Sequence, residues 1–418
     1  MSELRVLAGP PAAAGPERLH DHIARLGRAP SGTTTARGLI PVIEASGLLG
    51  RGGAGFPVGR KWRTLAERGH GPATLLVNAA EGEPLSAKDR TLLRLRPHLV
   101  LDGAFLAADA IDAARIVLYV GAGHRDAATS LDRAVRERGS LPRSVDLVLA
   151  PDTYVAGEES AAVHFVDEAD ARPTTTPPRV YERGIGGAPT LVQNVESLAH
   201  AALIGRYGDG WYREVGRGET LGTAMVTVSG SGRDGIREIA IGTTIAELAA
   251  ETGAGVDPSA RQAVLLGGYF GGWVSAERGW DLPLEPIALR DGGSAFGCGV
   301  VAFLGQDRCG VRATSRIMDW MAGQSAAQCG PCVFGLRAIA DATARVANGT
   351  AEGDELERLR RWSAQIAGRG ACRHPDGAVG QLLSSLRVFE GEWELHQRRR
   401  TCSRERAAWT PDRRADVA

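Results

Sequence analysis

The sequence predicts an α/β protein in which a parallel-sheet domain is followed by a small sheet domain and a bundle of helices. Between residues 74 and 149, apolar strands alternate with helices, which is typical of a parallel sheet with helices on its faces. From residue 221 short strands surround one helix, and from residue 311 apolar residues recur with a helical period. A chain of 418 residues is long enough for two or three domains.

The first domain, residues 37–220, is expected to contain three strands and several helices. The strands are predicted over residues 74–78, 115–120 and 145–149, and the helices over residues 39–46, 99–110 and 126–138. Ligands of parallel sheets bind at the carboxyl ends of the strands, so we expect a site there. Residues 1–36 are rich in Pro, Gly, Ala and Thr and are interpreted as an extension with one short helix near residues 17–26.

The second domain, residues 221–305, is interpreted as β-grasp-like. Its strands are predicted over residues 224–230, 235–241 and 262–268, the first two as a hairpin, with a helix over residues 244–251 that Thr244 caps. The bundle, residues 306–402, is predicted to have helices over residues 311–321, 332–347, 354–367 and 379–389, and a last helix that ends near residue 399. Residues 403–418 form a tail.

Composition excludes several classes of function. The formal net charge is zero, so nothing indicates a nucleic-acid partner. No stretch approaches the roughly 20 apolar residues of a membrane span, and no secretory signal is visible. We therefore expect a cytoplasmic protein with no direct membrane insertion. In that compartment the six cysteines would be thiols or metal ligands.

The glycine-rich stretch over residues 50–62 is the most informative part of the chain. It has five glycines in its first ten residues, and such backbone can approach a ligand closely and direct several N–H groups at a phosphate or a flat heterocycle. Only two of the 49 basic residues are lysines, and Lys61 and Lys88 both flank this region. Lysine offers a compact ammonium where the fork of a guanidinium would not fit.

Four motifs together resemble one known family. Residues 50–62, residues 78–84 with 88–90, residues 154–160 and residues 190–198 occur in the order and spacing of the NADH-binding flavin subunit of respiratory complex I. Flavin subunits of bidirectional hydrogenases and of NAD-dependent formate dehydrogenases contain the same module. The resemblance covers residues 38–402, and it implies an FMN-binding first domain, a β-grasp insert and a bundle that holds one [4Fe–4S] cluster.

The resemblance also implies which residues line the FMN and NADH sites. These are Gly50, Arg51, Gly52, Gly53, Gly55, Phe56, Lys61, Asn78, Glu81, Glu83, Gly157, Glu158, Glu159, Gln193 and Asn194. Two positions depart from the family pattern, because Ala80 stands where the family has an aspartate and Gln193 where it has an asparagine. The FMN phosphate is expected at the start of the helix that follows Asn194.

The nicotinamide site departs further from the family. Phe56 would pack beside the dinucleotide, and Glu83 and Glu159 correspond to carboxylates that touch NADH or order its pocket. However, Thr64 and Arg179 replace two aromatic residues that would grip the adenosine half, and Thr176 replaces a lysine. Each stacking ring contributes about 1 kcal/mol beyond the area it buries. A flavoprotein that exchanges electrons with ferredoxin without using nicotinamide therefore stays an alternative.

The cysteines give a partial cluster motif. The family has three cysteines spaced Cys-x-x-Cys-x-x-Cys and a fourth about forty residues later, whereas this chain has Ala326 followed by Cys329, Cys332 and Cys372. Three thiolates could hold a [3Fe–4S] cluster, or a [4Fe–4S] cluster whose fourth ligand is Ser325, His374, water or a partner. Zinc bound by the three cysteines and His374, or no metal at all, are the other possibilities. Cys298, Cys309 and Cys402 are expected to be packing residues without ligand-like neighbours.

The sequence thus predicts a flavin-dependent electron-transfer protein. The predicted activity is oxidation of NAD(P)H through FMN, with electrons passed to an iron–sulfur centre and then to a ferredoxin-like protein or a further redox subunit. No side chain needs to act as a proton catalyst, because the flavin supplies the redox chemistry. The second alternative is a non-redox scaffold or ligand-binding subunit.

Overall fold

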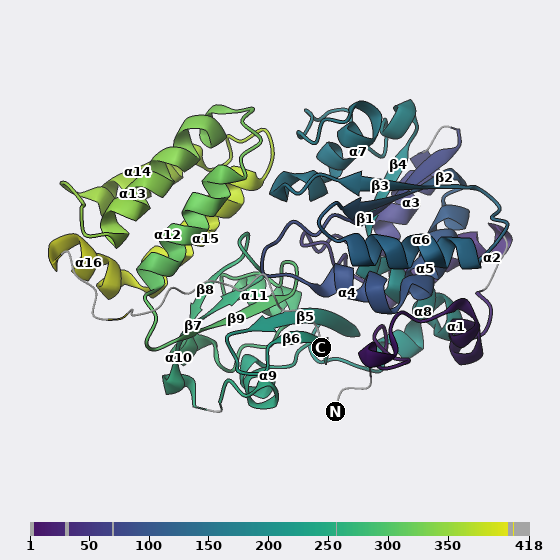
Figure 1. Cartoon of the computed structure of the whole chain (residues 1–418), viewed down its shortest axis with the longest axis horizontal. Helices are drawn as coiled ribbons and strands as arrows, with labels where there is room; N and C mark the ends of the chain where they lie inside the picture. Colours follow the sequence, from purple (N-terminus) through teal and green to yellow (C-terminus); the bar gives the residue numbers. More distant parts are fainter. Residues whose placement is uncertain (1–3, 30–32, 69–70, 256, 400–403, 405–418) are drawn as a thin grey trace.

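A four-stranded parallel sheet forms the centre of the first part of the chain (Figure 1). The computed structural model describes residues 4–29, 33–68, 71–255, 257–399 and 404. The strand order is β3-β2-β1-β4. The strands are β1 (Ala73–Ala79), β2 (Ala113–Gly121), β3 (Ser144–Ala150) and β4 (Thr190–Asn194). The three predicted strands are confirmed, each slightly longer than expected, whereas β4 had been interpreted as a loop.

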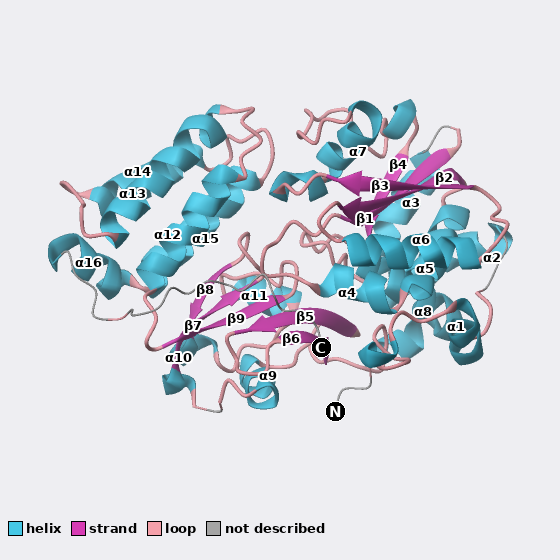
Figure 2. Cartoon of the chain, viewed as in Figure 1, coloured by secondary structure: helices cyan, strands magenta, loops and turns pink. Residues whose placement is uncertain are grey.

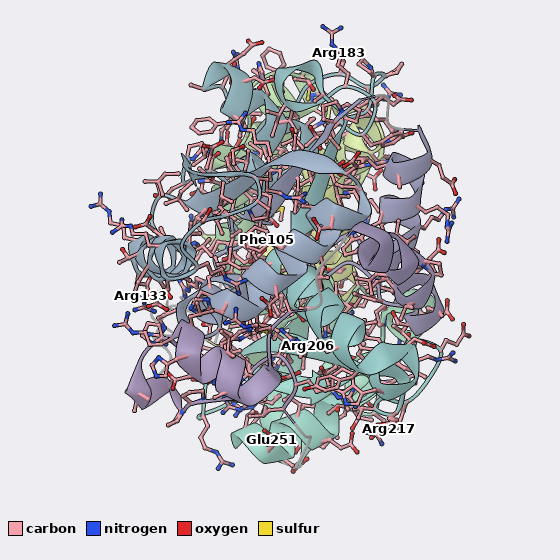
Figure 3. All side chains as sticks on the ribbon, turned by 90° about the vertical axis from the view of Figure 1, so that its right-hand side faces the viewer. Phe105, Arg133, Arg183, Arg206, Arg217 and Glu251 are labelled. Atoms are coloured by element: carbon pink, nitrogen blue, oxygen red, sulfur yellow. The ribbon has the colours of Figure 1, made fainter. Side chains whose placement is uncertain are left out.

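Helices cover both faces of this sheet. They are α2 (Thr33–Ser46), α3 (Val58–Arg68), α4 (Lys88–Leu95), α5 (Pro97–Ala110), α6 (Arg125–Glu137), α7 (Glu159–Glu168) and α8 (Val195–Arg213). Nearly all of α5 and the first half of α8 are buried, and the two helices pack against each other in the largest apolar core. Seen from this side, Arg133 and Arg183 project from the edge of the molecule, while Phe105 lies over its middle (Figure 3).

The contact between α5 and α8 depends on a glycine. A Cβ atom at Gly103 would lie 2.0 Å from the carbonyl oxygen of Leu198, far inside the van der Waals limit. We therefore expect Gly103→Ala to force the helices apart and to lower the free energy of unfolding by about 1–3 kcal/mol. Chemical denaturation would measure the loss. The control is Gly210→Ala, where nothing lies within 4 Å and no destabilisation is expected; equal stability of the two variants would contradict the prediction.

A second, five-stranded sheet follows (Figure 2). Its order is β6-β5-β9-β7-β8, with β5 (Thr223–Ser229), β6 (Gly235–Ala240), β7 (Arg261–Leu266), β8 (Gly272–Ser275) and β9 (Val300–Gly305). The predicted hairpin is confirmed, because β5 and β6 pair antiparallel. Helix α9 (Ile245–Thr252) begins after Thr244, whose side chain forms the expected cap. The short helices α10 (Ala276–Gly279) and α11 (Pro286–Asp291) and the strands β8 and β9 were not predicted.

Helices occupy the last part of the chain, at the positions that the periodicity indicates. They are α12 (Gly310–Gly323), α13 (Arg337–Ala347), α14 (Glu355–Ile366), α15 (His374–Val388) and α16 (Glu390–Arg399). A π-helical segment, η5 (Pro331–Leu336), precedes α13, so the single helix predicted over residues 332–347 has two parts. Helix α15 packs on β8, where the Trp273 N–H donates to Ser384 Oγ at 2.9 Å. No described helix is both long and apolar enough to cross a membrane.

The first residues of the chain join the two sheet regions. The backbone N–H groups of Arg5, Val6 and Leu7 all donate to the carboxylate of Glu238 on β6, at 2.9–3.0 Å. The Arg96 guanidinium, between α4 and α5, donates to the carbonyl oxygens of Leu7 and Ala8 at 2.9 Å. Residues 5–8, which we call the N-terminal strap, are therefore an ordered part of the fold, although the sequence suggested only an extension.

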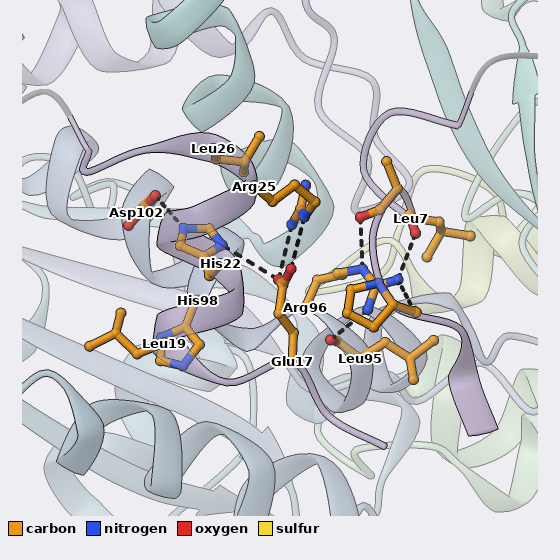
Figure 4. A network of polar contacts seen from close by, with 12 residues as sticks. Leu7, Glu17, Leu19, His22, Arg25, Leu26, Leu95, Arg96, His98 and Asp102 are labelled. Carbon is orange, nitrogen blue, oxygen red and sulfur yellow. Dashed lines mark hydrogen bonds and ion pairs between the residues drawn. The ribbon is translucent and has the colours of Figure 1, made fainter. Parts of the chain in front are cut away.

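Behind the strap, helix α1 (Leu19–Leu26) is held by a buried network (Figure 4). His22 Nε2 lies 2.8 Å from Asp102 Oδ2 on α5, and His22 Nδ1 lies 3.4 Å from Glu17 Oε2. Arg25 donates twice to the Glu17 carboxylate. Burial alone would lower the pKa of His22, but the Asp102 and Glu17 carboxylates outweigh it and raise that pKa above the usual value.

This network predicts pH-dependent stability. Because the pKa of His22 is higher in the folded state, its contribution is complete below the unfolded-state value of about 6.5 and is lost as pH rises through the folded-state pKa. We expect His22→Asn to cost about 1–3 kcal/mol at acidic pH and less at alkaline pH. Denaturation midpoints across pH would measure this. His20→Asn is the control, since the His20 side chain is 81% exposed; a cost for His22→Asn that does not change with pH would contradict the prediction.

Candidate functional site

The carboxyl ends of β1 and β4 bring two predicted site residues together. Asn78 and Asn194 are direct partners in the register of these parallel strands. Asn78 Nδ2 donates to the carbonyl oxygen of Gly157 at 2.9 Å, and Asn78 Oδ1 accepts from the Ala80 N–H at 3.1 Å. Residues from three of the four motifs therefore meet at this edge of the sheet, where ligands of parallel sheets bind.

The glycine-rich turn closes over the same edge. The Gly50 N–H donates to the carbonyl oxygen of Phe56 at 2.9 Å, which folds the turn back before α3 begins. Gly52 lies against Asn194, because a Cβ atom at residue 52 would be 3.3 Å from that of Asn194. Gly53 and Gly55 have positive φ, and the Cβ positions there have no atom within 4 Å. The turn is therefore anchored on its inner side and borders open space.

Arg51 anchors the turn from beneath. Its backbone N–H donates to Ser197 Oγ at 2.9 Å, and its buried guanidinium donates to the Tyr212 hydroxyl at 3.1 Å and to the Thr223 carbonyl at 3.2 Å. Ser197 lies in the first turn of α8, and Thr223 begins β5. Arg51 thus fixes the turn to the fold and is not itself available to a ligand, in contrast to its predicted place in the cofactor site.

Lys61 and Glu159 form an accessible ion pair at the rim of this space. Lys61 Nζ on α3 lies 2.9 Å from Glu159 Oε2 at the start of α7, and it also donates to the Val192 carbonyl at 2.9 Å. The Lys61 side chain is 24% exposed and that of Glu159 37%. Phe56 is 49% exposed. These three side chains can therefore reach a molecule bound at the turn.

Other predicted carboxylates cap helices. Glu158 accepts from the N–H groups of Ser160 and Ala161, at 2.9 and 3.0 Å, and so begins α7. Glu81 accepts from the N–H groups of Asp89 and Arg90, at 3.1 and 3.2 Å, and so begins α4. Both carboxylates position the helices around the site.

The side chains of Gln193 and Glu83 point to protein partners. Gln193 Oε1 accepts from Trp62 Nε1 at 3.2 Å. Glu83 is buried, and its Oε2 accepts from the Tyr269 N–H at 2.8 Å and from the Tyr154 hydroxyl at 3.1 Å. Burial, only partly offset by these hydrogen bonds, raises the pKa of Glu83 to about 7. Since Tyr269 follows β7, Glu83 joins the candidate site to the second sheet.

A buried charge network supports Asn194, and sequence reasoning missed two of its members. Lys88 Nζ lies 2.6 Å from Asp89 Oδ1 and 3.0 Å from Glu196 Oε2. Asp89 Oδ2 accepts from Asn194 Nδ2 at 2.7 Å, and Asn194 Oδ1 accepts from the Glu196 N–H at 2.9 Å as the cap of α8. The scarcity of lysine pointed to Lys88, but no local pattern pointed to Asp89 or Glu196 as its partners.

The three predicted ligand cysteines gather beside η5. Cys332 opens this segment, Cys329 precedes it, and Cys372 lies just before α15. The Ser325 hydroxyl and the Cys329 thiol interact with the Cys332 thiol, and Cys372 is close enough to act on it electrostatically. Burial raises the pKa of Cys332 to about 11. Three thiols and one hydroxyl thus face a common region.

The proposed zinc site is not formed by the described residues. Among them, no three His, Cys, Asp or Glu side chains lie close enough together to hold one metal ion. His374 Nε2 lies 2.8 Å from the carbonyl oxygen of Met321, to which it donates. Its ring packs against those of Tyr154 and Phe270, each with centroids 5.8 Å apart.

The cysteine segment lies directly against the first domain. Gln324 Oε1 accepts from the Tyr154 N–H at 2.9 Å, and Gln328 Nε2 donates to the Pro173 carbonyl at 2.9 Å. The rings of Tyr154 and Trp320, on α12, meet edge to face with centroids 5.1 Å apart. Residues 154–158 therefore connect the glycine turn to the thiols, as an electron path between the two sites requires.

Two of the remaining cysteines differ from expectation. The prediction that Cys309 has no ligand-like neighbour is wrong, because its Sγ lies 3.3 Å from Nε2 of the buried His396 on α16. Cys298 is partly exposed, and its thiol donates to the Gly267 carbonyl at 3.4 Å. Cys402 lies outside the described residues. The Cys309–His396 pair joins two helices far apart in sequence, so no spacing pattern could have revealed it.

Comparison with known proteins identifies the family. Residues 43–203 match the Nuo51 FMN-binding domain, and residues 312–396 match the NADH-ubiquinone oxidoreductase-F iron-sulfur binding region. The NADH-quinone oxidoreductase-F protein of Streptomyces coelicolor is 30% identical over 377 residues, which are 87% of this chain and 84% of that protein. The chain belongs to the NADH-quinone oxidoreductase-F family.

Further relatives come from two kinds of complex. A Rhizobium meliloti protein of the same name, numbered 2, is 29% identical, and the match covers 89% of this chain and 91% of that protein. The HndC protein of the NADP-reducing hydrogenase of Solidesulfovibrio fructosivorans is 28% identical, over 93% of this chain and 82% of its own length. Among solved structures, an air-oxidised NAD⁺-reducing [NiFe]-hydrogenase matches with a TM-score of 0.82 at 28% identity, over 93% of this chain and 66% of the hydrogenase chain.

Family membership confirms the predicted class of protein and its cofactors. The chain is an NADH dehydrogenase-like oxidoreductase module with an FMN-binding domain and an iron–sulfur region. The geometry fits FMN, because the exposed glycine turn, the capped start of α8 and the Lys61–Glu159 pair surround one open space. It fits an iron–sulfur cluster with three thiol ligands, which all lie within the matched region.

Proposed function

We propose that this chain oxidises NADH and delivers the electrons to a partner redox subunit. Bound FMN supplies the chemistry, because a flavin accepts two electrons as hydride and releases them singly. The observation that carries the proposal is the contact between the two candidate sites through residues 154–158, whose Tyr154 N–H binds Gln324 beside the thiols. The relatives that this chain resembles are subunits of NADH-quinone oxidoreductase and of hydrogenase, which supports a redox partner.

The residues around the glycine turn have distinct tasks in this proposal. The backbone of Gly52, Gly53 and Gly55 approaches the flavin, and the N-terminus of α8, capped by Asn194, attracts the phosphate group. Lys61 provides a fixed positive charge at the rim, held by Glu159. Glu81, Glu158 and Gln193 act indirectly, because they hold α4, α7 and Trp62 in place.

The nicotinamide contacts are Phe56 and the Glu159 carboxylate, the exposed groups beside the turn. Glu83 orients Tyr154 through its hydrogen bond. We further propose that the domains have the bounds 37–220, 221–305 and 306–402, with a β-grasp fold in the second and an iron–sulfur bundle in the third. The protein is proposed to act in the cytoplasm.

One observation favours the alternative of a flavoprotein that exchanges electrons with ferredoxin. The side of the turn where the family has aromatic residues for the adenosine half carries Thr64 and the exposed Arg179. Thr64 Oγ1 donates to the Arg60 carbonyl at 2.8 Å and offers no stacking surface. Arg179 can stack through its guanidinium plane, which gives the adenosine half one replacement contact.

An anaerobic titration separates these functions. FMN-loaded protein is mixed with NADH, NADPH or reduced ferredoxin, and the visible band of oxidised flavin is followed. Bleaching by NADH supports the proposal, whereas bleaching by ferredoxin alone supports the alternative. Phe56→Ala should weaken the NADH response and leave FMN affinity unchanged; the control is Phe334→Ala, which removes a 75% exposed ring on η5. A protein that binds no flavin would overturn both functions.

A further inference from the structure

We propose that the Ser325 hydroxyl oxygen is the fourth ligand of the iron–sulfur cluster, beside Cys329, Cys332 and Cys372. The inference rests on the proposed function, which places a cluster at these thiols. A cubane cluster has four irons that each need a protein or solvent ligand, and thiolates supply them in the usual site. This chain has a methyl group at residue 326, so one iron has no cysteine to bind.

The loop before η5 positions Ser325 for this task. Its hydroxyl interacts with the Cys332 thiol, so it lies at the edge of the group of sulfurs. The Ala327 N–H donates to Ser325 Oγ at 3.0 Å, and Ala327 has a left-handed backbone with φ of 54°. That conformation turns the chain sharply between Ser325 and Cys329. The hydroxyl is thereby directed to the thiols although its residue lies one position before the missing cysteine.

His374 is the competing protein ligand, and its contacts argue against it. Its Nε2 donates to the Met321 carbonyl at 2.8 Å, and both of its ring neighbours, Tyr154 and Phe270, are aromatic. The backbone N–H of His374 interacts with the Cys372 thiol, whereas no thiol acts on its ring. The imidazole thus belongs to the aromatic packing behind the cluster, and the hydroxyl to the cluster region.

The chemistry of an oxygen ligand has measurable consequences. When the cluster assembles, the Ser325 hydroxyl releases its proton to solvent, its oxygen bonds to the fourth iron, and a water leaves that iron. Oxygen is a harder donor than thiolate, so this iron differs from the other three in its spectroscopic signature. Because ligand bonds replace protonated groups, removal of the oxygen makes the same iron the first to be lost.

The test is anaerobic reconstitution of the full FMN-containing chain as wild type, Ser325→Ala, Ala326→Cys and His374→Gln. Iron and sulfide analysis, Mössbauer spectra and EPR before and after mild oxidation are the readouts. We expect a [4Fe–4S] cluster with one distinct iron in the wild type. Ser325→Ala should lose that iron about tenfold faster on oxidation and show the EPR signal of a [3Fe–4S] cluster. Ala326→Cys should remove the distinct iron signature.

Several outcomes would overturn the inference. One is a Ser325→Ala protein with the same iron content, spectra and rate of iron loss as the wild type; another is loss of the distinct iron in His374→Gln and not in Ser325→Ala. A wild type that holds three irons would also overturn it. If no variant, Ala326→Cys included, assembles a cluster while FMN binds, the proposed electron path fails together with the inference; a cluster that ignores residue 325 overturns the inference alone.

Discussion

Replacement of Lys88 by Met should lower the free energy of unfolding by about 3–5 kcal/mol, because it leaves buried carboxylates without a counter-ion. The Lys88 side chain is 2% exposed and neutralises Asp89 and Glu196, at 2.6 and 3.0 Å. Burial alone would lower the pKa of Lys88, but these carboxylates outweigh it and raise that pKa. With the ammonium gone, the two acidic groups would repel each other in a medium that solvates neither.

The same substitution should weaken FMN binding. Asp89 holds Asn194 Nδ2 at 2.7 Å, and Asn194 caps the helix whose N-terminus is proposed to hold the phosphate. Denaturation midpoints and FMN fluorescence titrations would measure the two effects. Lys61→Met is the matched control, since its side chain is 24% exposed and its pair with Glu159 should contribute about 1 kcal/mol or less. A Lys88→Met protein as stable as this control would refute the role of the buried ammonium.

Replacement of Glu238 by Ala should release the N-terminal strap. The carboxylate accepts three backbone N–H groups and the Thr223 hydroxyl, the latter at 2.6 Å. Each N–H left buried without an acceptor costs about 1–3 kcal/mol. The strap is therefore expected to detach, which also frees Arg96 from the carbonyls of Leu7 and Ala8.

Hydrogen exchange at the amides of residues 5–7 is the direct measurement. These amides should be protected in the wild type and exchange rapidly in Glu238→Ala, while strands β1 and β2 keep their protection. Glu251→Ala is the control, because its side chain is 62% exposed and lies on α9 of the same sheet region. Unchanged protection of residues 5–7 in Glu238→Ala would show that the strap is held by other contacts.

Local patterns predicted the strands that are bounded by turns and apolar throughout. β1 and β2 are buried along most of their length, so their apolar runs are clear in the sequence. β4 was missed because its five residues end in Gln193 and Asn194, which read as the start of a loop. Its place beside β1 depends on pairing across the sheet, and only that pairing sets Asn194 opposite Asn78.

The candidate site shows the same limit. The glycine turn, Lys61, Asn78 and the three cysteines are recognisable because each belongs to a short motif. The partners that fix them are not: Glu196 meets Lys88, and Gln324 meets Tyr154, only in the folded chain. For Glu158 the motif was visible, but its task as a helix cap depends on where α7 begins.

The scarcity of lysine has a practical consequence for the study of this protein's assemblies. Of its two lysine amines, one is 2% exposed between two acids and the other is paired at the rim of the turn. Acylating labels and amine-directed crosslinkers will therefore find a single reachable lysine on the whole chain. Proximity maps of the complex should instead be built with carboxylate- or guanidine-directed reagents, and protection of that one amine would itself report on cofactor occupancy.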